Sequence, residues 1–152
     1  MPSRNITLQR VSADTGAALA ELRVVAMRES LEAIGRFDPV RARARFLGSF
    51  APEFTREVLN EGARVGFVVV RPEEDHLLLD HLYVIPSAQG LGIGAEVLRI
   101  VFAEADAQKK SLKVGALKQS RSNEFYLRHG FKLVESSEWD NYYVRQSEPG
   151  ET

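Results

Sequence analysis

The sequence predicts an α/β fold of mixed α+β character, with a central mixed β-sheet and helices on both of its faces. The main observation is that residues 77–102 read as a buried strand, a glycine turn and an amphipathic helix in succession. The expected elements follow the order β-α-α-β-β-β-α-β-α-β-β, which is typical of a mixed sheet covered by helices. No repeat or linker divides the 152 residues, so we expect a single domain, residues 1–152.

The first part of the chain is expected to form a strand and a helix. Alternating apolar and polar residues predict a strand over residues 6–11. Ser12 or Asp14 is expected to cap the helix that follows, and Gly35 is expected to end it. The apolar stripe of this helix includes Leu19, Leu22, Ala26 and Met27.

A second, shorter helix is expected next. Asp38 and Pro39 read as an N-cap followed by a proline at the first helical position, which predicts a helix through Leu47. The helix carries three arginines, Arg41, Arg43 and Arg45, and we expect them to be solvated surface residues. The alternative is that Arg41 and Arg45 face an acidic acceptor. Three phenylalanines have the spacing of core or pocket-wall residues: Phe46, Phe50 and Phe54.

The other elements are predicted from apolar runs and the residues that stop them. A hairpin is expected around residues 60–62, joining strands at residues 56–59 and 65–70. Pro86 ends the central strand. Four elements are expected after the central helix: a strand at residues 112–117, a helix at residues 122–129 stopped by Gly130, and strands at residues 131–135 and 141–146. Residues 147–152 are expected to be a flexible tail.

Three glycines at alternate positions, Gly90, Gly92 and Gly94, follow the central strand. Glycine lets the backbone turn tightly and approach a ligand without a Cβ in the way. The free N–H groups at the start of the next helix face that turn, with the positive end of the helix dipole behind them. The stretch therefore predicts an anion site, and phosphate is the anion that suits it best.

Several kinds of protein use such a turn. A P-loop needs Gly-Lys-Ser/Thr at the helix start, where this chain has Gly94-Ala95-Glu96. Residues 90–95 do satisfy the dinucleotide pattern G-x-G-x-x-G/A. The next strand, however, ends in Lys118 instead of the acidic residue that would hold a ribose. A turn with no ligand needs one glycine and not three.

Two sequence blocks resemble motifs of the GNAT superfamily of acyl-CoA-dependent N-acyltransferases. The family's Q/R-x-x-G-x-G/A turn is similar to residues 89–94, and its N-x-x-x-x-F-Y-x-x-x-G-F block is similar to residues 120–131. The blocks have the family's order and spacing, and the resemblance covers about half of the chain in motif detail. It implies a GNAT-like mixed sheet, acetyl-CoA as cosubstrate, and transfer of its acetyl group to a primary amine by direct attack in a ternary complex.

The resemblance also implies which residues hold the cosubstrate. The backbone of Leu82, Tyr83 and Val84 would bind the pantetheine arm as an added strand. Gln89 would brace the glycine turn or touch phosphate. The pyrophosphate would lie on the turn itself, formed by Gly90, Leu91, Gly92, Ile93, Gly94 and Ala95. Ser120 stands where the family usually has Asn, so either Ser120 or Asn123, one turn on, is expected to make that contact.

Three residues are candidates for catalysis. By the same resemblance, Tyr126 would face the thioester sulfur as a donor or general acid, with a core aromatic as the alternative. A free amine has a pKa near ~10, so a base or a water chain must remove a proton before it attacks. Asp80 and His81 lie near the expected thioester on opposite strand faces, so at most one serves directly. His81 has the better intrinsic pKa, with a packed histidine as its alternative.

The other chemistry-bearing residues have ordinary interpretations. His76 and His129 are expected at the surface, and three scattered histidines predict no metal site. The chain has no cysteine and no Gly-x-Ser-x-Gly elbow, so no covalent intermediate is expected. An aromatic-rich stretch could wall an acceptor pocket, although a β-rich edge with aromatics is the ordinary explanation: Trp139, Asp140, Tyr142 and Tyr143.

The composition limits the kinds of partner that we expect the protein to bind. Twenty basic and twenty-one acidic residues give a formal charge of −1, which predicts no binding to nucleic acid or to an acidic membrane. Residues 1–5 do not lead into a signal-peptide core, and no apolar run approaches the ~20 residues that a membrane span needs. We therefore expect a cytoplasmic protein. The sequence leaves open whether the protein forms a homodimer.

The sequence does not name the acceptor, a small-molecule or peptide amine. Aminoglycosides, polyamines, amino acids, protein N-termini and lysines all stay open. The alternative from another functional class is a non-catalytic module that binds or senses an acyl-CoA. A dinucleotide-binding protein is the least favoured interpretation.

Overall fold

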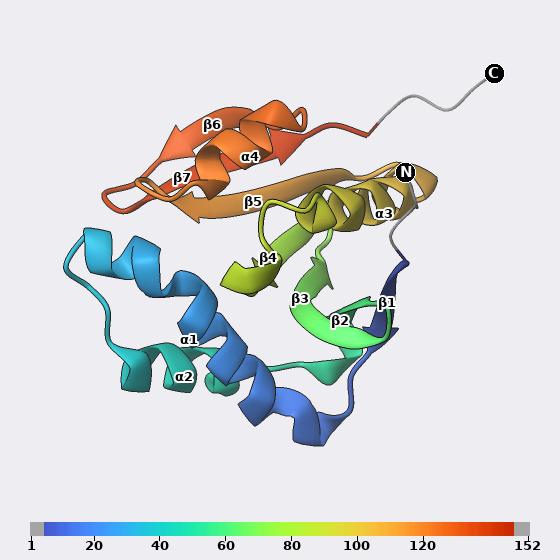
Figure 1. Ribbon diagram of the computed structural model, residues 1–152. Helices are drawn as coiled ribbons and strands as arrows, with labels where there is room; N and C mark the ends of the chain where they lie inside the picture. The colour runs from blue at the N-terminus through green and yellow to red at the C-terminus, as the bar shows by residue number, and fades with distance from the viewer. Residues whose placement is uncertain (1–4, 148–152) are drawn as a thin grey trace. The chain divides into compact units, whose positions relative to one another are not determined.

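The computed structural model describes residues 5–147, which form a mixed seven-stranded sheet with four α-helices. The strand order is β1-β2-β3-β4-β5-β7-β6 (Figure 1). The elements are β1 (Ile6–Arg10), α1 (Gly16–Ala33), α2 (Pro39–Gly48), β2 (Thr55–Asn60), β3 (Ala63–Pro72), β4 (His76–Val84), α3 (Ile93–Ala107), β5 (Ser111–Leu117), α4 (Ser122–Arg128), β6 (Lys132–Ser136) and β7 (Asp140–Arg145). This confirms the predicted fold class and element order.

The chain divides into two compact units. The first unit comprises residues 1–69 and 81–97, and the second comprises residues 70–80 and 98–152. The strands β3 and β4 and the helix α3 each contribute to both units. The single-domain boundary, residues 1–152, stays a prediction. The expected tail lies outside the described residues from residue 148 onward.

In the first unit, α1 and α2 lie side by side, and their apolar residues pack against β3 (Figure 1). The rings of Phe46 in α2 and Phe67 in β3 meet edge to face with their centroids 5.2 Å apart. Phe50 and Phe54 pack against the same cluster, which confirms the predicted role of the three phenylalanines. Five consecutive residues of β3, numbers 65–69, are buried. Both faces of this strand are therefore covered.

The helix ends confirm one predicted cap and correct another. Asp38 caps α2, because its carboxylate accepts a hydrogen bond from the Arg41 N–H at 3.1 Å. Gly35 ends α1 in the left-handed conformation, with φ of +70°. The prediction that Ser12 or Asp14 caps α1 is wrong. A 3₁₀ turn intervenes, and the Ser12 hydroxyl donates to the Asp14 carboxylate instead of capping the helix.

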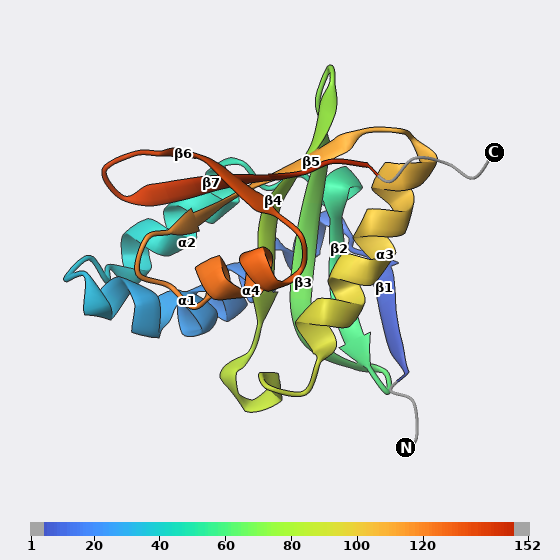
Figure 2. The same cartoon turned by 90° about the horizontal axis from the view of Figure 1, so that it is seen from above.

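In the second unit, β7 lies between β5 and β6 and is antiparallel to both (Figure 2). Arg145 of β7 is nearly buried and forms a bidentate pair with Asp106, at 2.9 and 3.1 Å. Its guanidinium also lies 4.0 Å from the centroid of the Phe102 ring. These contacts tie the end of the last strand to the helix α3.

The strand at one end of the sheet, β6, has a different character from its neighbours. All five of its residues are exposed, and its register with β7 shifts between Leu133 and Glu135. A charged residue lies near each end, Lys132 and Glu135. Short length, charge and irregular register are the features by which natural proteins protect a free sheet edge.

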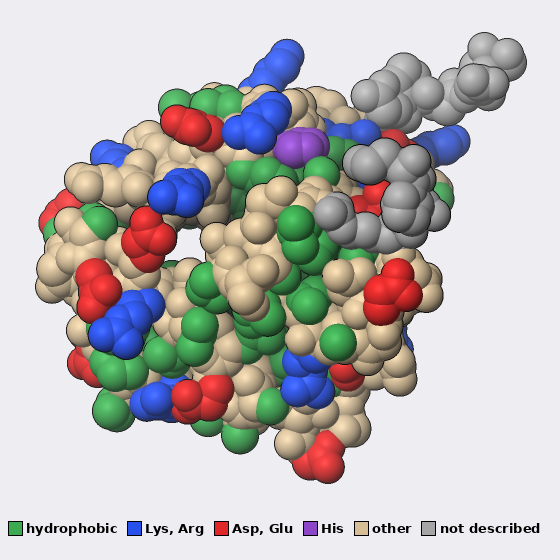
Figure 3. All heavy atoms as spheres, in the orientation of Figure 1, with side chains coloured by type: hydrophobic (Ala, Val, Ile, Leu, Met, Phe, Trp, Pro, Cys, Tyr) green, Lys and Arg blue, Asp and Glu red, His purple; other side chains and the backbone are tan. Residues whose placement is uncertain are grey.

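The outer surface has no dominant charge on the face that Figure 3 shows, where acidic and basic side chains are interspersed among the others. This agrees with the net charge of −1. None of the helices within residues 5–147 has the length and apolar character that a membrane span requires.

Gly66 lets β3 approach β4 closely in the first unit. A Cβ placed on Gly66 would lie 2.2 Å from the carbonyl oxygen of Tyr83. The pairing of β2 with β3 changes register here, so Val65 is an extra residue in a β-bulge. The Val65 carbonyl accepts a hydrogen bond from the Ile85 N–H at 2.8 Å. Bulge and glycine together fix the end of β4.

We expect Gly66→Ala to lower the free energy of unfolding by roughly 1–3 kcal/mol, because the added methyl group must push the backbone of β4 away. Urea denaturation measures this change. Gly48→Ala is the control, because nothing lies within 4 Å of a Cβ at that position. Equal stability of the two variants would contradict the close approach.

Candidate functional site

The pairing of β4 with β5 ends before β4 itself does. The parallel pairing with β5 runs from His76 to Leu79, whereas β4 itself continues to Val84. Within the described residues, Leu82, Tyr83 and Val84 therefore have no register partner in β5. The N–H and C=O groups on an unpaired edge can bind an extended ligand as an added strand.

The predicted anion turn follows directly. The Gln89 side chain donates a hydrogen bond to the Val84 carbonyl at 2.9 Å and so braces the turn against the strand. Gly90 and Gly92 have φ of +79° and +81°, a conformation that side-chain-bearing residues rarely adopt. Gly94 lies outside the left-handed region. The backbone conformation thus favours glycine at two of the three positions.

The helix α3 begins at Ile93, whose side chain is buried and anchors the helix start. Gly90, Leu91 and Gly92 are exposed, and Gly94 and Ala95 are half-buried. The first N–H groups of an α-helix have no partner within the helix. An exposed turn before such a helix start is a site at which an anion can bind.

A cluster of side chains surrounds the hydroxyl of Tyr83 in the first unit. The Nδ1 atom of His81 lies 3.2 Å from this hydroxyl, and the Nε of Arg23 donates to it at 3.4 Å. The hydroxyl in turn donates to the sulfur of Met27 at 3.3 Å. The His81 ring also meets the Phe46 ring edge to face at 5.5 Å. His81 and Tyr83 therefore share the face of β4 that α1 and α2 cover.

Arg23 was missed by the sequence analysis, although a signal was present. It lies four residues after Leu19 and four before Met27, within the stripe that faces the core. A positive charge inside an apolar stripe is unusual and calls for a partner. That partner, Tyr83, is 60 positions away in the sequence, so local pattern alone did not reveal it.

Asp80 has different surroundings from His81, as strand alternation predicts. Its carboxylate accepts a hydrogen bond from the Nε of Arg71 at 2.8 Å, and both side chains are partly buried in the second unit. This ion pair occupies the carboxylate. His81, in contrast, contacts aromatic rings and a hydroxyl in the first unit.

In the second unit, Tyr126 is a buried residue of α4, with 5% of its surface exposed. Its ring meets the Phe131 ring edge to face at 5.2 Å and lies 6.2 Å from the Tyr143 ring. The packing fixes the ring firmly. The expectation that its hydroxyl takes part in catalysis stays a prediction.

Asn123 organises the turn between β5 and α4. Its Nδ2 donates to the carbonyls of Leu117 and Ser120 at 2.7 and 2.9 Å. Its Oδ1 accepts hydrogen bonds from the Tyr143 hydroxyl at 2.7 Å and from Asn141 at 3.0 Å. The Ser120 hydroxyl donates to the Leu117 carbonyl at 2.9 Å. Protein groups thus engage both ends of the Asn123 amide.

The remaining candidates were expected at the surface or in the aromatic-rich stretch. His76 pairs with Asp75 at 2.6 Å, and this hydrogen bond lowers the pKa of Asp75. The Nδ1 of His129 lies 2.8 Å from the Phe125 carbonyl oxygen. In the aromatic-rich stretch, Tyr143 is buried whereas Trp139 and Tyr142 are exposed. No group of three or more residues within 5–147 is arranged to hold a metal ion.

The predicted site residues thus fall into two sets. The first unit contains His81, Leu82, Tyr83, Val84, Gln89, Gly90, Leu91, Gly92, Ile93, Gly94 and Ala95. The second unit contains Asp80, Ser120, Asn123 and Tyr126. The first unit thus contains the end of β4, the glycine turn and the imidazole of His81, together with Arg23, a cation that the sequence analysis did not predict.

Comparison with solved structures supports the fold over almost the whole chain. The PaiA N-acetyltransferase from Thermoplasma acidophilum in complex with coenzyme A matches with a TM-score of 0.78 and 14% identity, over 93% of this chain and 99% of that one. An acetyltransferase from Thermus thermophilus matches with a TM-score of 0.74 and 19% identity, over 93% and 96%. A GNAT family acetyltransferase from Elizabethkingia anophelis with acetyl-CoA bound gives 0.67 and 18%, over 93% and 98%.

Comparison of sequences gives the family. No curated protein matches the chain. The family model described as an acetyltransferase (GNAT) domain, however, matches residues 56–133, more than half of the 152 residues. The matched region contains the strand edge, the glycine turn and α4. The chain therefore belongs to the GNAT family of acetyltransferases.

Proposed function

We propose that this enzyme transfers the acetyl group of acetyl-CoA to a primary amine, by direct attack in a ternary complex. The observation that carries the proposal is that the end of β4, Leu82–Val84, lies beyond the pairing with β5 and leads directly into the glycine turn that Gln89 braces. Acetyl-CoA has an extended pantetheine arm that leads to a pyrophosphate, which matches a strand end followed by an anion-binding turn. Two of the similar structures contain coenzyme A or acetyl-CoA, which supports the same ligand here.

The cosubstrate would be held mainly by backbone groups. The pantetheine arm carries amides that can pair with the edge of β4 as a strand does. The pyrophosphate would accept hydrogen bonds from the N–H groups of the turn and of the start of α3, where the helix dipole favours negative charge. Gly90 and Gly92 keep the turn free of side chains at the positions of closest approach.

The reaction needs a proton acceptor and a proton donor. The amine nitrogen attacks the thioester carbonyl carbon, the C–S bond breaks, and the thiolate takes up a proton. We assign the removal of the amine proton to His81, because Arg71 already pairs with the alternative base, Asp80. Tyr126 is the proposed donor to the thiolate. Ser120 contributes a cosubstrate contact, and Asn123 builds the turn that carries Ser120.

The first test is binding. Acetyl-CoA is expected to raise the thermal midpoint, because a ligand that binds only the folded state stabilises it by mass action. NAD is the control, since it shares a pyrophosphate but lacks the pantetheine arm. A shift with NAD and none with acetyl-CoA would reverse the assignment.

A second test concerns the turn. Gly92→Val should abolish the stabilisation by acetyl-CoA, because it places a branched side chain at a left-handed position that faces the anion. Gly35→Val is the matched control, since Gly35 has a similar φ of +70° and no neighbour within 4 Å of a Cβ. Both variants lose some stability to backbone strain. Normal acetyl-CoA binding by Gly92→Val would show that the turn does not hold the pyrophosphate.

A third test separates chemistry from packing at Tyr126. Tyr126→Phe keeps the packed ring and removes the hydroxyl, so kcat should fall by about 10²–10⁴ while acetyl-CoA affinity barely changes. Steady-state kinetics and a binding titration measure the two quantities.

Tyr143→Phe is the control for Tyr126→Phe. Its hydroxyl bonds Asn123, so the variant should lose roughly 0.5–1.5 kcal/mol of stability with little change in kcat. If Tyr126→Phe behaves in the same way as this control, Tyr126 has no role in the mechanism.

A further inference from the structure

We propose that the acceptor carries a carboxylate a few bonds from its amine, as an amino acid does, and that Arg23 binds this carboxylate. The inference rests on the proposed acetyl transfer and narrows its substrate class. It depends on three observations about the first unit, namely the burial of Arg23, its lack of a counter-ion, and its distance from His81.

Arg23 is half-buried and held in place by neutral partners. Its Nη1 donates to the Ala42 carbonyl of α2 at 2.7 Å, and its Nε donates to the Tyr83 hydroxyl at 3.4 Å. The guanidinium carbon lies 6.0 Å from the Tyr83 ring centroid. No carboxylate within residues 5–147 pairs with Arg23, and Nη2 has no hydrogen-bond partner there.

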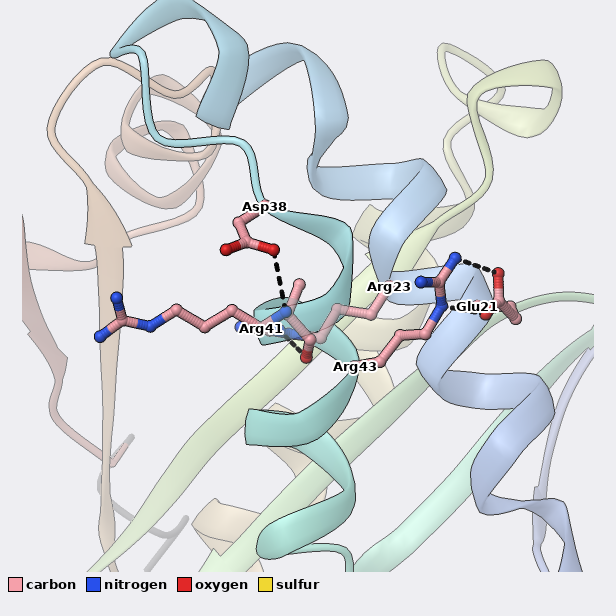
Figure 4. A network of polar contacts seen from close by, with 6 residues as sticks. Glu21, Arg23, Asp38, Arg41 and Arg43 are labelled. Carbon is pink, nitrogen blue, oxygen red and sulfur yellow. Dashed lines mark hydrogen bonds and ion pairs between the residues drawn. The ribbon is translucent and has the colours of Figure 1, made fainter.

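The nearby carboxylates already have other partners. Glu21 of α1 accepts hydrogen bonds from two nitrogens of Arg43, and this contact raises the pKa of Arg43 (Figure 4). Asp38 caps the start of α2. Arg23 is therefore a partly desolvated cation without a counter-ion, which is an unfavourable state that a bound anion would relieve.

The position of Arg23 relates it to the proposed base. One hydroxyl, that of Tyr83, lies within 3.4 Å of the Arg23 Nε and 3.2 Å of the His81 Nδ1. An acceptor whose carboxylate meets the guanidinium would therefore bring an amine a few bonds away toward the imidazole. Guanidinium and carboxylate match in geometry, and their charge-assisted hydrogen bonds are stronger than neutral ones.

The same charge disfavours other acceptors. Polyamines and aminoglycosides carry several positive charges, which a half-buried arginine without a counter-ion would repel. Arg41 and Arg45, which the sequence suggested for an acidic acceptor, are exposed on α2 and so interact with a charged ligand through solvent. Of these three arginines, Arg23 is the best placed to bind the carboxylate of an acceptor.

The test compares an amino acid with its carboxamide, which has the same side chain and amine but no negative charge. CoA release gives kcat/KM for both compounds with the wild type and with three variants. The wild type should prefer the amino acid. Arg23→Gln should lower kcat/KM for the amino acid by about 10–100-fold and leave the carboxamide nearly unchanged. Arg23→Lys, which keeps the charge, should recover part of the preference.

Two controls keep the outcomes distinct. Arg43→Gln removes the same charge from a residue already paired with Glu21, so it should keep the preference for the amino acid. Stabilisation by acetyl-CoA shows that each variant is folded. Equal losses on both compounds in Arg23→Gln, or a wild-type preference for the carboxamide or a polyamine, would overturn the Arg23 assignment and leave the transfer activity standing. Absence of CoA release with every amine would overturn both the Arg23 assignment and the proposed acetyl transfer.

Discussion

The close approach of β3 to the end of β4 is the constraint on which the candidate site depends. Gly66 has no Cβ, so the carbonyl of Tyr83 can lie against the β3 backbone, and the bulge at Val65 supplies the bond to Ile85. These two contacts hold the end of β4 against β3. Toward β5, the pairing of β4 ends at Leu79, so Leu82, Tyr83 and Val84 have no register partner in that strand.

The two units use polar groups in opposite ways. In the second unit, protein groups engage both ends of the Asn123 amide, and Arg145 has a carboxylate and an aromatic ring as neighbours. Such saturation favours rigidity. In the first unit, the start of α3 and Arg23 retain capacity for further bonds. Unmet bonding capacity in an otherwise well-packed unit is what a binding site requires.

The sequence predicted the fold well because glycine, proline and capping residues divide this chain clearly. The glycine turn was predictable for the same reason, since φ near +80° at Gly90 and Gly92 leaves few alternatives. Two kinds of feature could not be predicted from the sequence. The cap at Ser12 failed because a neighbouring carboxylate competes for the hydroxyl. Arg23 was missed because its contact to Tyr83 joins residues 60 positions apart.

The edge strand β6 has a consequence for the behaviour of the protein in concentrated solution. Another molecule that added a strand there would have to remove water from Lys132 and Glu135 and match an irregular register. Each of these requirements opposes growth of the sheet from one molecule to the next. The strand β6 therefore opposes self-association into fibres through its end of the sheet.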